Sequence, residues 1–398
     1  MSIAHRTLTV TYSIGIERHF SQHPDVLEGS NEIMGGMCQS SACQRCEGMP
    51  AAIDGAGTLY LWFPLGHSLG KGLLSLQRAE ARYQPVGDKQ CVLVRLNAGD
   101  IEGVVAGLMA AFSGEEARDT KTLFLARREE PQLADFAQVM PLQQLSTLLQ
   151  SSWLIDILEQ ERVTSFFQPI VLATDPSHIF AHEALLRGID GNGALMSPKP
   201  MFDLARDASL LFQLDRVARL SAIRTAGRLG IGSHIFVNFN PSSVYDPAFC
   251  LRSTVQAIDE FGIDRDRVVF EVVESDSYSD LDHLRSTLDY YRNAGFRIAL
   301  DDFDVGFSSF GLVGQLKPDF IKLDMSLIHN VHIDPVKAVI ANNILETANQ
   351  LGIETVAEGV EVQEELDWAR DHRATFVQGY FIARPTDTPI PSVETAKF

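Results

Sequence analysis

Five short apolar segments in the second half of the sequence each carry an acidic residue at one end, and this constrains the fold more than any other feature. Each segment has the length and apolar character of a buried β-strand. A protein core cannot hold several carboxylates at strand ends without positive charge close by. Oxygen ligands of this kind bind hard divalent cations such as Mg²⁺ and Mn²⁺. The pattern therefore predicts a metal-dependent enzyme, and the acids are Glu183, Glu271, Asp301, Asp324 and Glu358.

Strand-like segments alternate with amphipathic helical stretches after about residue 165, which is typical of a parallel α/β fold. Eight strands in about 230 residues fit a TIM-like (β/α)8 barrel better than an open sheet. Such barrels keep their active sites at the carboxyl ends of the strands, where the polar residues of this sequence also cluster. The expected strands are Phe166–Leu172, His182–Arg187, Ile235–Asn240, Val268–Glu274, Arg297–Phe303, Phe320–Asp324, Glu354–Val360 and Phe376–Phe381, with helices including Leu210–Leu229, Leu281–Ala294 and Val336–Leu351.

Composition excludes several kinds of protein. At 398 residues and 45% hydrophobic, the chain is long enough for two or three domains with ordinary cores. The net charge of −19 argues against a surface for DNA, RNA or anionic membranes, whereas a single nucleotide bound through metal ions is compatible with it. No apolar run approaches the roughly 20 residues of a membrane span, and no charged-then-apolar signal peptide opens the sequence. We therefore expect a cytoplasmic protein.

The N-terminal part predicts a smaller α/β domain. The expected strands are Thr58–Leu65, Gln90–Leu96 and Leu123–Ala126, and the expected helices are Leu69–Tyr83 and Asp100–Phe112. Pro141–Val163 carries leucines at helical spacing and predicts a connecting helix, which either forms part of a dimer seam or packs on its own barrel. The expected organisation is a regulatory module over residues 1–128, a connecting segment over residues 129–163 and a barrel domain over residues 164–398.

Eight short motifs follow one another along the second half of the sequence. They are Phe167–Ile170, Glu183–Arg187, Val237–Pro241, Glu271–Ser275, Asp301–Phe303, Lys322–Asp324, Glu358–Glu361 and Gln378–Tyr380. A single triplet of this kind is weak evidence, whereas the ordered set is specific. Together the motifs resemble the EAL-domain family of cyclic-di-GMP phosphodiesterases over roughly residues 150–398. The N-terminal module resembles no family that we recognise.

The resemblance implies two divalent cations, Mg²⁺ or Mn²⁺, at the carboxyl ends of the barrel strands. Two such cations clamp the attacking and leaving oxygens of a phosphodiester displacement and acidify the attacking water. Four of the implied ligands hold the first cation, while Asp302 and Glu358 help to hold the second and Asp301 bridges the two. The implied ligands are Glu183, Asn238, Glu271, Asp301, Asp302 and Glu358.

Further roles follow from the same resemblance. Lys322 orients the attacking water and offsets charge that develops on the phosphate. Gln378 orients the nucleophile by hydrogen bonding, and Glu358 shares proton handling. Arg187 and Gln168 contact the substrate, because an arginine fork matches the geometry of a phosphate.

One loop departs from the family pattern. Family members usually carry a glycine directly after the Asp-Asp-Phe motif, whereas Asp304 follows Phe303 in this sequence. The extra carboxylate alters the charge beside the metals or stiffens a loop that usually has a permissive backbone, so it bears on regulation and turnover but removes no ligand. Glu274 matches the family position that anchors this loop, which in the family couples metal binding to dimer contacts.

The leading hypothesis is an enzyme that linearises cyclic-di-GMP to pGpG as a homodimer, under the control of its N-terminal module. The alternative is a catalytically inactive receptor that binds cyclic-di-GMP and signals through protein contacts. Relatives of that kind typically lack one or more ligands or the lysine, and here every such position is filled. A third hypothesis makes the N-terminal module the functional centre, a redox or metal switch with the barrel as its effector.

The N-terminal cysteines allow three interpretations. The sequence has five cysteines, an odd number that indicates reduced thiols rather than a disulfide framework. Cys38, Cys43 and Cys46 match the first three ligands of a plant-type two-iron ferredoxin, with Cys91 as a candidate fourth. A zinc site completed by His67 or Cys91 is the second interpretation. Three thiols without a ligand in a loop are the third.

Overall fold

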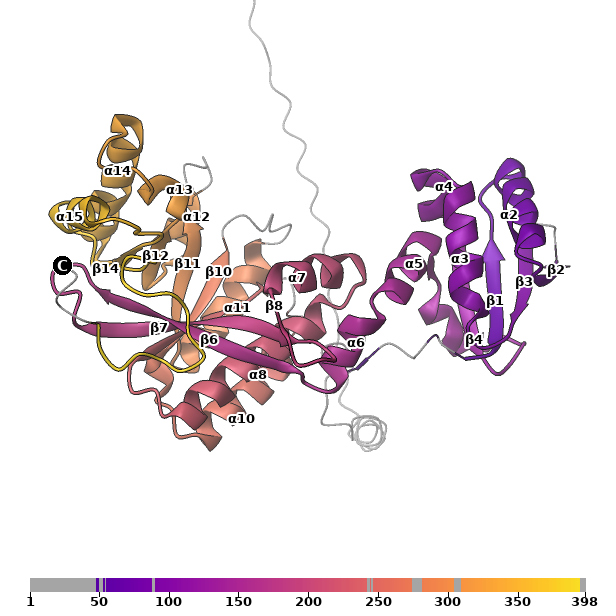
Figure 1. The fold of residues 1–398 in the computed structure, drawn as a ribbon, viewed down its shortest axis with the longest axis horizontal. Coiled ribbons are helices and arrows are strands. Elements are labelled where there is room, and N and C mark those ends of the chain that lie inside the picture. The colour runs from indigo at the N-terminus through magenta and orange to yellow at the C-terminus, as the bar shows by residue number, and fades with distance from the viewer. Residues whose placement is uncertain are drawn as a thin grey trace, which may run out of the picture. The chain divides into compact units, whose positions relative to one another are not determined.

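A computed structural model describes residues 48–49, 53, 55–87, 90–241, 244, 246–273, 281–303 and 309–393. Within these ranges the chain forms a five-stranded sheet before residue 142 and a nine-stranded sheet after residue 162 (Figure 1). In these ranges we find no helix with the length and apolar character needed to cross a membrane.

The five-stranded sheet is antiparallel throughout and has the order β2-β3-β1-β4-β5. Its central strand β1 alternates between two apolar clusters, because successive side chains of a strand point to opposite faces. Leu59 and Leu61 pack with residues of the helices, whereas Tyr60 packs in a second cluster on the opposite face. The elements are β1 (Gly57–Trp62), α2 (Gly66–Arg78), β2 (Arg82–Val86), β3 (Cys91–Leu96), α3 (Asp100–Ala111), α4 (Gly114–Asp119), β4 (Lys121–Ala126), η1 (Leu133–Gln138), β5 (Met140–Pro141) and α5 (Leu142–Gln150).

Two expectations for this part of the chain were wrong in detail. The helix expected over Leu69–Tyr83 ends at Arg78, and a strand that the sequence did not predict, β2, follows it. Glu80 between them has a left-handed φ of 51°, which a helix cannot accommodate. The connecting helix expected over Pro141–Val163 is two short helices, α5 and α6 (Ser152–Glu159), separated at Ser151. Residues of α5 lie in the core of the small domain, and those of α6 pack with barrel residues.

The larger sheet closes on itself into the expected TIM-like barrel. Its strand order is β6-β14-β13-β12-β11-β10-β9-β7, and β7 pairs back with β6. The strands are β6 (Val163–Leu172), β7 (Ile179–Ile189), β9 (His234–Asn238), β10 (Val268–Val273), β11 (Arg297–Phe303), β12 (Phe320–Leu323), β13 (Glu354–Ala357) and β14 (Phe376–Val377), and the short β8 (Leu195–Met196) pairs with the end of β7. The helices around them are α7 (Pro198–Asp207), α8 (Leu211–Leu229), α9 (Pro247–Cys250), α10 (Arg252–Glu260), α11 (Leu281–Asn293), α12 (Ser309–Leu316), α13 (Met325–Ile328), α14 (Pro335–Leu351) and α15 (Gln363–Asp371), with a short 3-10 helix, η3 (Arg265–Arg267), before β10.

One strand departs from the parallel arrangement of the others. β6 runs antiparallel to both of its neighbours, β7 and β14. Only residues 173–178 join β6 to β7, whereas a parallel connection needs about a dozen residues or more. The remaining seven barrel strands are parallel, so their carboxyl ends meet at one end of the barrel.

A layer of apolar side chains inside the barrel fixes where the polar residues lie. Each barrel strand contributes one buried residue to it: Ile170, Ala181, Phe236, Val269, Ala299, Phe320, Val356 and Phe376. Because side chains two positions apart along a strand point to the same face, the residue two positions further on lies above this layer inside the barrel. In the parallel strands that residue is polar in every case. In β6, which runs the other way, the polar residue comes two positions earlier.

Helix α4 of the small domain is held by one carboxylate. Ser113 and Glu116 form a reciprocal capping box at its N-terminus, and Glu116 also accepts hydrogen bonds from Ser68 (2.9 Å) and Lys71 (2.8 Å) of α2. The hydrogen bond from Lys71, followed by those from Ser113 and Ser68, lowers the pKa of Glu116 to about 2. The ionised carboxylate therefore ties two helices together.

We predict that Glu116→Gln lowers the stability of the small domain at neutral pH. The Glu116 pKa is depressed in the folded protein, so its contribution is complete above the ordinary value of 4.5 and is lost as the pH falls towards 2. The difference in melting temperature between wild type and variant should accordingly shrink between pH 4.5 and about 2. A difference that stays constant over this range in thermal melts would contradict this account.

Candidate active site

The polar side chains above the apolar layer are the residues that the sequence predicted for the site. They come from the eight strands of the barrel or the residues directly after them: Gln168, Glu183, Asn238, Glu271, Asp301, Lys322, Glu358 and Gln378. Most of these side chains are buried. The structure therefore brings together at one end of the barrel residues that are up to 210 positions apart in the sequence.

Lys322 lies among the carboxylates. Its ammonium nitrogen is 2.6 Å from Glu271 Oε1, 2.7 Å from Glu358 Oε1 and 2.9 Å from Asp301 Oδ1. A fourth carboxylate oxygen, Glu183 Oε1, is 3.7 Å away. The lysine side chain is only 1% exposed, so these acids are its counter-charges in place of water. Removal of the lysine or of the carboxylates would leave buried charge of the other sign without compensation.

Two amide side chains fix the orientation of Glu183. Gln378 Nε2 donates to Glu183 Oε2 at 2.6 Å, and Asn238 Nδ2 donates to Glu183 Oε1 at 3.2 Å. Gln378 also donates to Gln168 Oε1 at 3.2 Å, and Gln168 in turn donates to the carbonyl oxygen of Ala383 at 3.1 Å. This chain of hydrogen bonds runs from β6 across β14 to β7 and β9.

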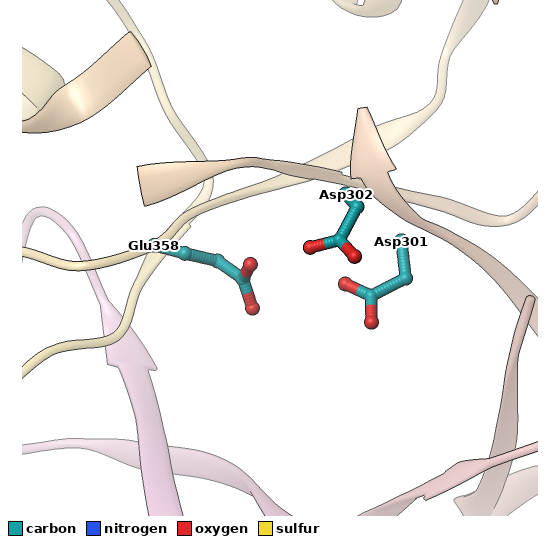
Figure 2. Close-up of side chains that lie close together, drawn as sticks. All are labelled: Asp301, Asp302 and Glu358. Carbon is teal, nitrogen blue, oxygen red and sulfur yellow. The ribbon is translucent and has the colours of Figure 1, made fainter. Parts of the chain in front are cut away.

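Asp301, Asp302 and Glu358 form a second focus of negative charge (Figure 2). Figure 2 shows the three carboxylates converging, two from the end of β11 and one from the segment after β13. One oxygen atom of each lies within 4.8 Å of the others, close enough to bind one cation together. Asp302 has a left-handed φ of 53°, uncommon outside glycine, which lets consecutive aspartates share this space.

The electrostatics show that the carboxylates are not all ionised when Lys322 is the sole cation among them. Burial raises the pKa of Glu358 to about 8, against the attraction of Lys322, and burial followed by repulsion from Asp301 raises the pKa of Asp302 to about 6. The pKa of Glu271 lies well above its ordinary range, mainly because the group is fully buried. Burial alone would lower the pKa of Lys322, but Asp301, Glu183 and the other carboxylates outweigh it and raise the pKa.

The donor set suits a hard divalent cation. Carboxylate and amide oxygens are the ligands that Mg²⁺ and Mn²⁺ prefer. Among the residues that the structure describes, Glu271 Oε2 is buried without a hydrogen-bond partner, a state that a cation would relieve. A cation would also offset the burial and the repulsion between carboxylates that raise the pKa values of Asp302 and Glu358.

A cavity of about 440 Å³ adjoins this polar layer. It is lined by Glu183 and Asn238 on one side and by α7 residues such as Phe202 and Arg206 on the other. Arg187 lies near this region, with its guanidinium 5.2 Å from the centre of the Phe166 ring. The arrangement offers a nucleotide apolar surface and cationic groups beside the acidic cluster.

Tyr380 and Arg384 are additional residues near the site that the sequence did not single out by role. The guanidinium of Arg384 lies 4.2 Å from the centre of the Tyr380 ring, and Tyr380 is 52% exposed. The sequence pointed to Tyr380 only as the last residue of the Gln378–Tyr380 motif.

Several predicted residues lie outside the residues described. These are Glu274, Asp304, Cys38, Cys43 and Cys46. Cys91 is described and lies buried at the start of β3 in the apolar cluster around Tyr60. His67 is exposed and lies 3.4 Å from Glu116. A zinc or iron–sulfur site that uses these cysteines stays a prediction.

Comparison with known proteins identifies the barrel. The family described as "EAL domain" matches residues 150–385, more than half of the sequence. The chain belongs to the EAL-domain family. A solved structure of a standalone EAL protein from Vibrio cholerae O395, in its c-di-GMP-bound form, is 32% identical with a TM-score of 0.53 and covers 59% of this chain and 97% of that one. The N-terminal module lies outside the family match.

Curated relatives of the EAL domain carry related names. The probable cyclic di-GMP phosphodiesterase PdeG of Escherichia coli K12 is 33% identical over 229 residues, which cover 56% of this chain and 44% of that protein. The cyclic di-GMP phosphodiesterase NbdA of Pseudomonas aeruginosa is 27% identical over 241 residues, covering 60% of this chain and 30% of that protein. The chain thus spans less than half the length of these two relatives.

We predict that Lys322→Met destabilises the metal-free protein. Loss of one partner from a buried cluster of charges costs about 3–5 kcal/mol of unfolding free energy. Added Mn²⁺ should restore stability, so the rise in melting temperature between EDTA and Mn²⁺ should be larger for the variant than for wild type.

The control is Lys121→Met, which removes an exposed lysine at the start of β4 in the small domain and should change neither value. Equal melting temperatures for wild type and Lys322→Met in EDTA would show that Lys322 is not the counter-charge of the cluster.

Proposed function

We propose that this chain hydrolyses cyclic-di-GMP to the linear dinucleotide pGpG with the help of two Mg²⁺ or Mn²⁺ ions. The observation that carries the proposal is the layer of carboxylates and amides around Lys322, with four acids within 3.7 Å of its ammonium group. The family match supports the choice of substrate, because the Vibrio cholerae relative was solved with c-di-GMP bound and the curated relatives are named as phosphodiesterases.

The residues present would suit two divalent cations, and Asp301 would help to hold both. When bound, divalent cations neutralise phosphate charge and lower the pKa of a coordinated water. The unpartnered Glu271 oxygen and the convergence of Asp301, Asp302 and Glu358 are the observations that support two positions rather than one. The first position would be held by Glu183, Asn238, Glu271 and Asp301, and the second by Asp301, Asp302 and Glu358.

The chain's own residues bind and orient the reactants. Arg187 binds a phosphate through its guanidinium fork, and Gln168 contacts the substrate from β6. Lys322 stabilises the negative charge that develops on the phosphate, since its ammonium group is held rigidly in a site that excludes water. Gln378 keeps Glu183 in one orientation through the 2.6 Å hydrogen bond.

The reaction consumes one water molecule. Its oxygen bonds to phosphorus while the bond from phosphorus to the 3′-oxygen of the neighbouring ribose breaks, and the freed 3′-oxygen takes up a proton. Glu358 would share the handling of these protons, because its carboxylate lies in the site beside Lys322, at 2.7 Å from the ammonium nitrogen. The product keeps one phosphodiester bond and one terminal phosphate.

We further propose that the protein acts in the cytoplasm as a homodimer and that the N-terminal module regulates the barrel. Glu274 would anchor the loop after Asp302, which in the family pattern links the metal site to dimer contacts. Light scattering coupled to size-exclusion chromatography measures the oligomeric state, and a monomer at all concentrations would refute the dimer.

We predict that purified protein converts cyclic-di-GMP to pGpG in Mn²⁺ or Mg²⁺ and that Glu183→Ala lowers the rate at least about 100-fold, since Glu183 is proposed to be a metal ligand. Product is measured by chromatography. A matched control is Glu354→Ala, which removes a half-buried carboxylate at the opposite end of a barrel strand and should keep most of the activity.

Nucleotide binding without turnover in either metal would refute the hydrolase and identify the chain as a cyclic-di-GMP receptor.

A further inference from the structure

A buried ion pair lies on α8, behind the polar layer. Arg219 is 1% exposed and Asp215 is 3% exposed, four positions apart on the face of α8 that packs against the barrel. Charged groups in such a position cost free energy unless each is fully paired, and apolar residues would fill the same helix face without that cost. The pair therefore calls for an explanation beyond packing.

Arg219 uses its donors to join three elements. Its Nε donates to Asp215 Oδ2 at 2.9 Å, and its Nη1 donates to Thr254 Oγ1 of α10 at 2.7 Å. The plane of its guanidinium also lies over the ring of Phe239, 5.7 Å from the ring centre. Arg219 thus contacts the residue that directly follows Asn238.

Asp215 contacts the next residue of the same segment, Asn240. Its second oxygen, Oδ1, accepts a hydrogen bond of 2.9 Å from the backbone N–H of Asn240. Arg219 fixes the orientation of the carboxylate that makes this bond. The two residues after Asn238 are therefore held from the α8 side, one through its ring and one through its backbone.

The same segment is held from the opposite side by β10. The backbone N–H of Phe239 donates to the carbonyl oxygen of Glu271 at 2.9 Å, and Asn238 lies beside Glu271 in the register of the two strands. The end of β9 is thus clamped between the ion pair on α8 and the strand that carries Glu271. Apolar packing of β9 in the barrel would not by itself require these polar contacts at the end of the strand.

We propose that Arg219 is a positioning residue that fixes the direction of the Asn238 side chain toward the metal site. The inference rests on the proposed function, because it takes Asn238 to be a metal ligand. Arg219 acts through Asp215 and Phe239, and its contacts with the described residues do not include a proposed metal ligand. Partners of this outer kind typically alter metal affinity by 10–100-fold when they are removed.

The test measures Mn²⁺ affinity by calorimetric titration of the full chain without nucleotide. Arg219→Met keeps the length of the side chain but removes its charge and its hydrogen bonds, and it should weaken Mn²⁺ binding about 10-fold. Arg219→Lys keeps a charge beside Asp215 but lacks the fork that spans to Thr254, so it should weaken binding less. Asp215 itself is left unchanged, because it also lines the cavity beside the site.

Leu345→Ala is the matched control for a loss of stability. Leu345 is fully buried on α14, outside the clamp, and its truncation leaves a cavity without touching the end of β9. It should lower the melting temperature and leave Mn²⁺ affinity unchanged.

Wild-type affinity in Arg219→Met, or an equal loss in Leu345→Ala, overturns the positioning role. Should Arg219→Met not fold, Arg219→Lys decides, and unchanged affinity in that variant overturns the proposal. Wild-type protein that binds no Mn²⁺ instead refutes the proposed metal site itself.

Discussion

The ammonium group of Lys322 and the carboxylates around it are the constraint on which the rest of the barrel depends. One cation faces four acids within 3.7 Å in a space with almost no access to water. Such a cluster is stable only where the chain supplies further polar partners and keeps its geometry fixed. The amides of Gln378 and Asn238 supply those partners, and the closed barrel fixes the geometry. Burial raises the pKa values of Glu271, Asp302 and Glu358 in spite of Lys322, and bound metal ions would favour the ionised form of these converging carboxylates.

Much of this arrangement was predictable because the period of a β-strand is two residues. A polar residue two positions beyond a buried apolar one must share its face, so Phe320 inside the barrel implies Lys322 above it. The sequence could not reveal the direction of β6, since an apolar run has the same pattern in both directions. Gln168 nevertheless reaches the site layer, because it precedes Ile170 in a strand that runs the opposite way. The residue therefore lies in the same layer as the others, although its strand runs antiparallel to both neighbours.

The features that escaped prediction depend on backbone conformation or on long-range contacts. β2 follows α2 after a turn in which Glu80 adopts a left-handed conformation, and propensity does not show where such a residue ends a helix. The break at Ser151 separates helices that belong to two different cores, a division that one helical pattern conceals. The positive φ of Asp302 interrupts the regular alternation of side chains between the two faces of β11. Arg219 and Asp215 look in sequence like an ordinary helical ion pair with spacing i, i+4, and only their burial sets them apart.

Lys322 and Arg219 are both buried cations, yet they should affect the metal site in opposite directions. Lys322 offsets the charge of the carboxylates directly, so it competes with any cation that binds them. Within the part of the chain that the structure describes, Arg219 contacts Asp215, Thr254 and Phe239 rather than those carboxylates, and it holds the strand end that carries Asn238. Removal of Lys322 would leave the carboxylates more negative and so raise their affinity for a metal ion. Removal of Arg219 would leave the Asn238 side chain without a fixed direction and so lower that affinity. The metal affinity of the site therefore depends on both residues: Lys322 stabilises the metal-free protein, and Arg219 keeps a proposed ligand oriented.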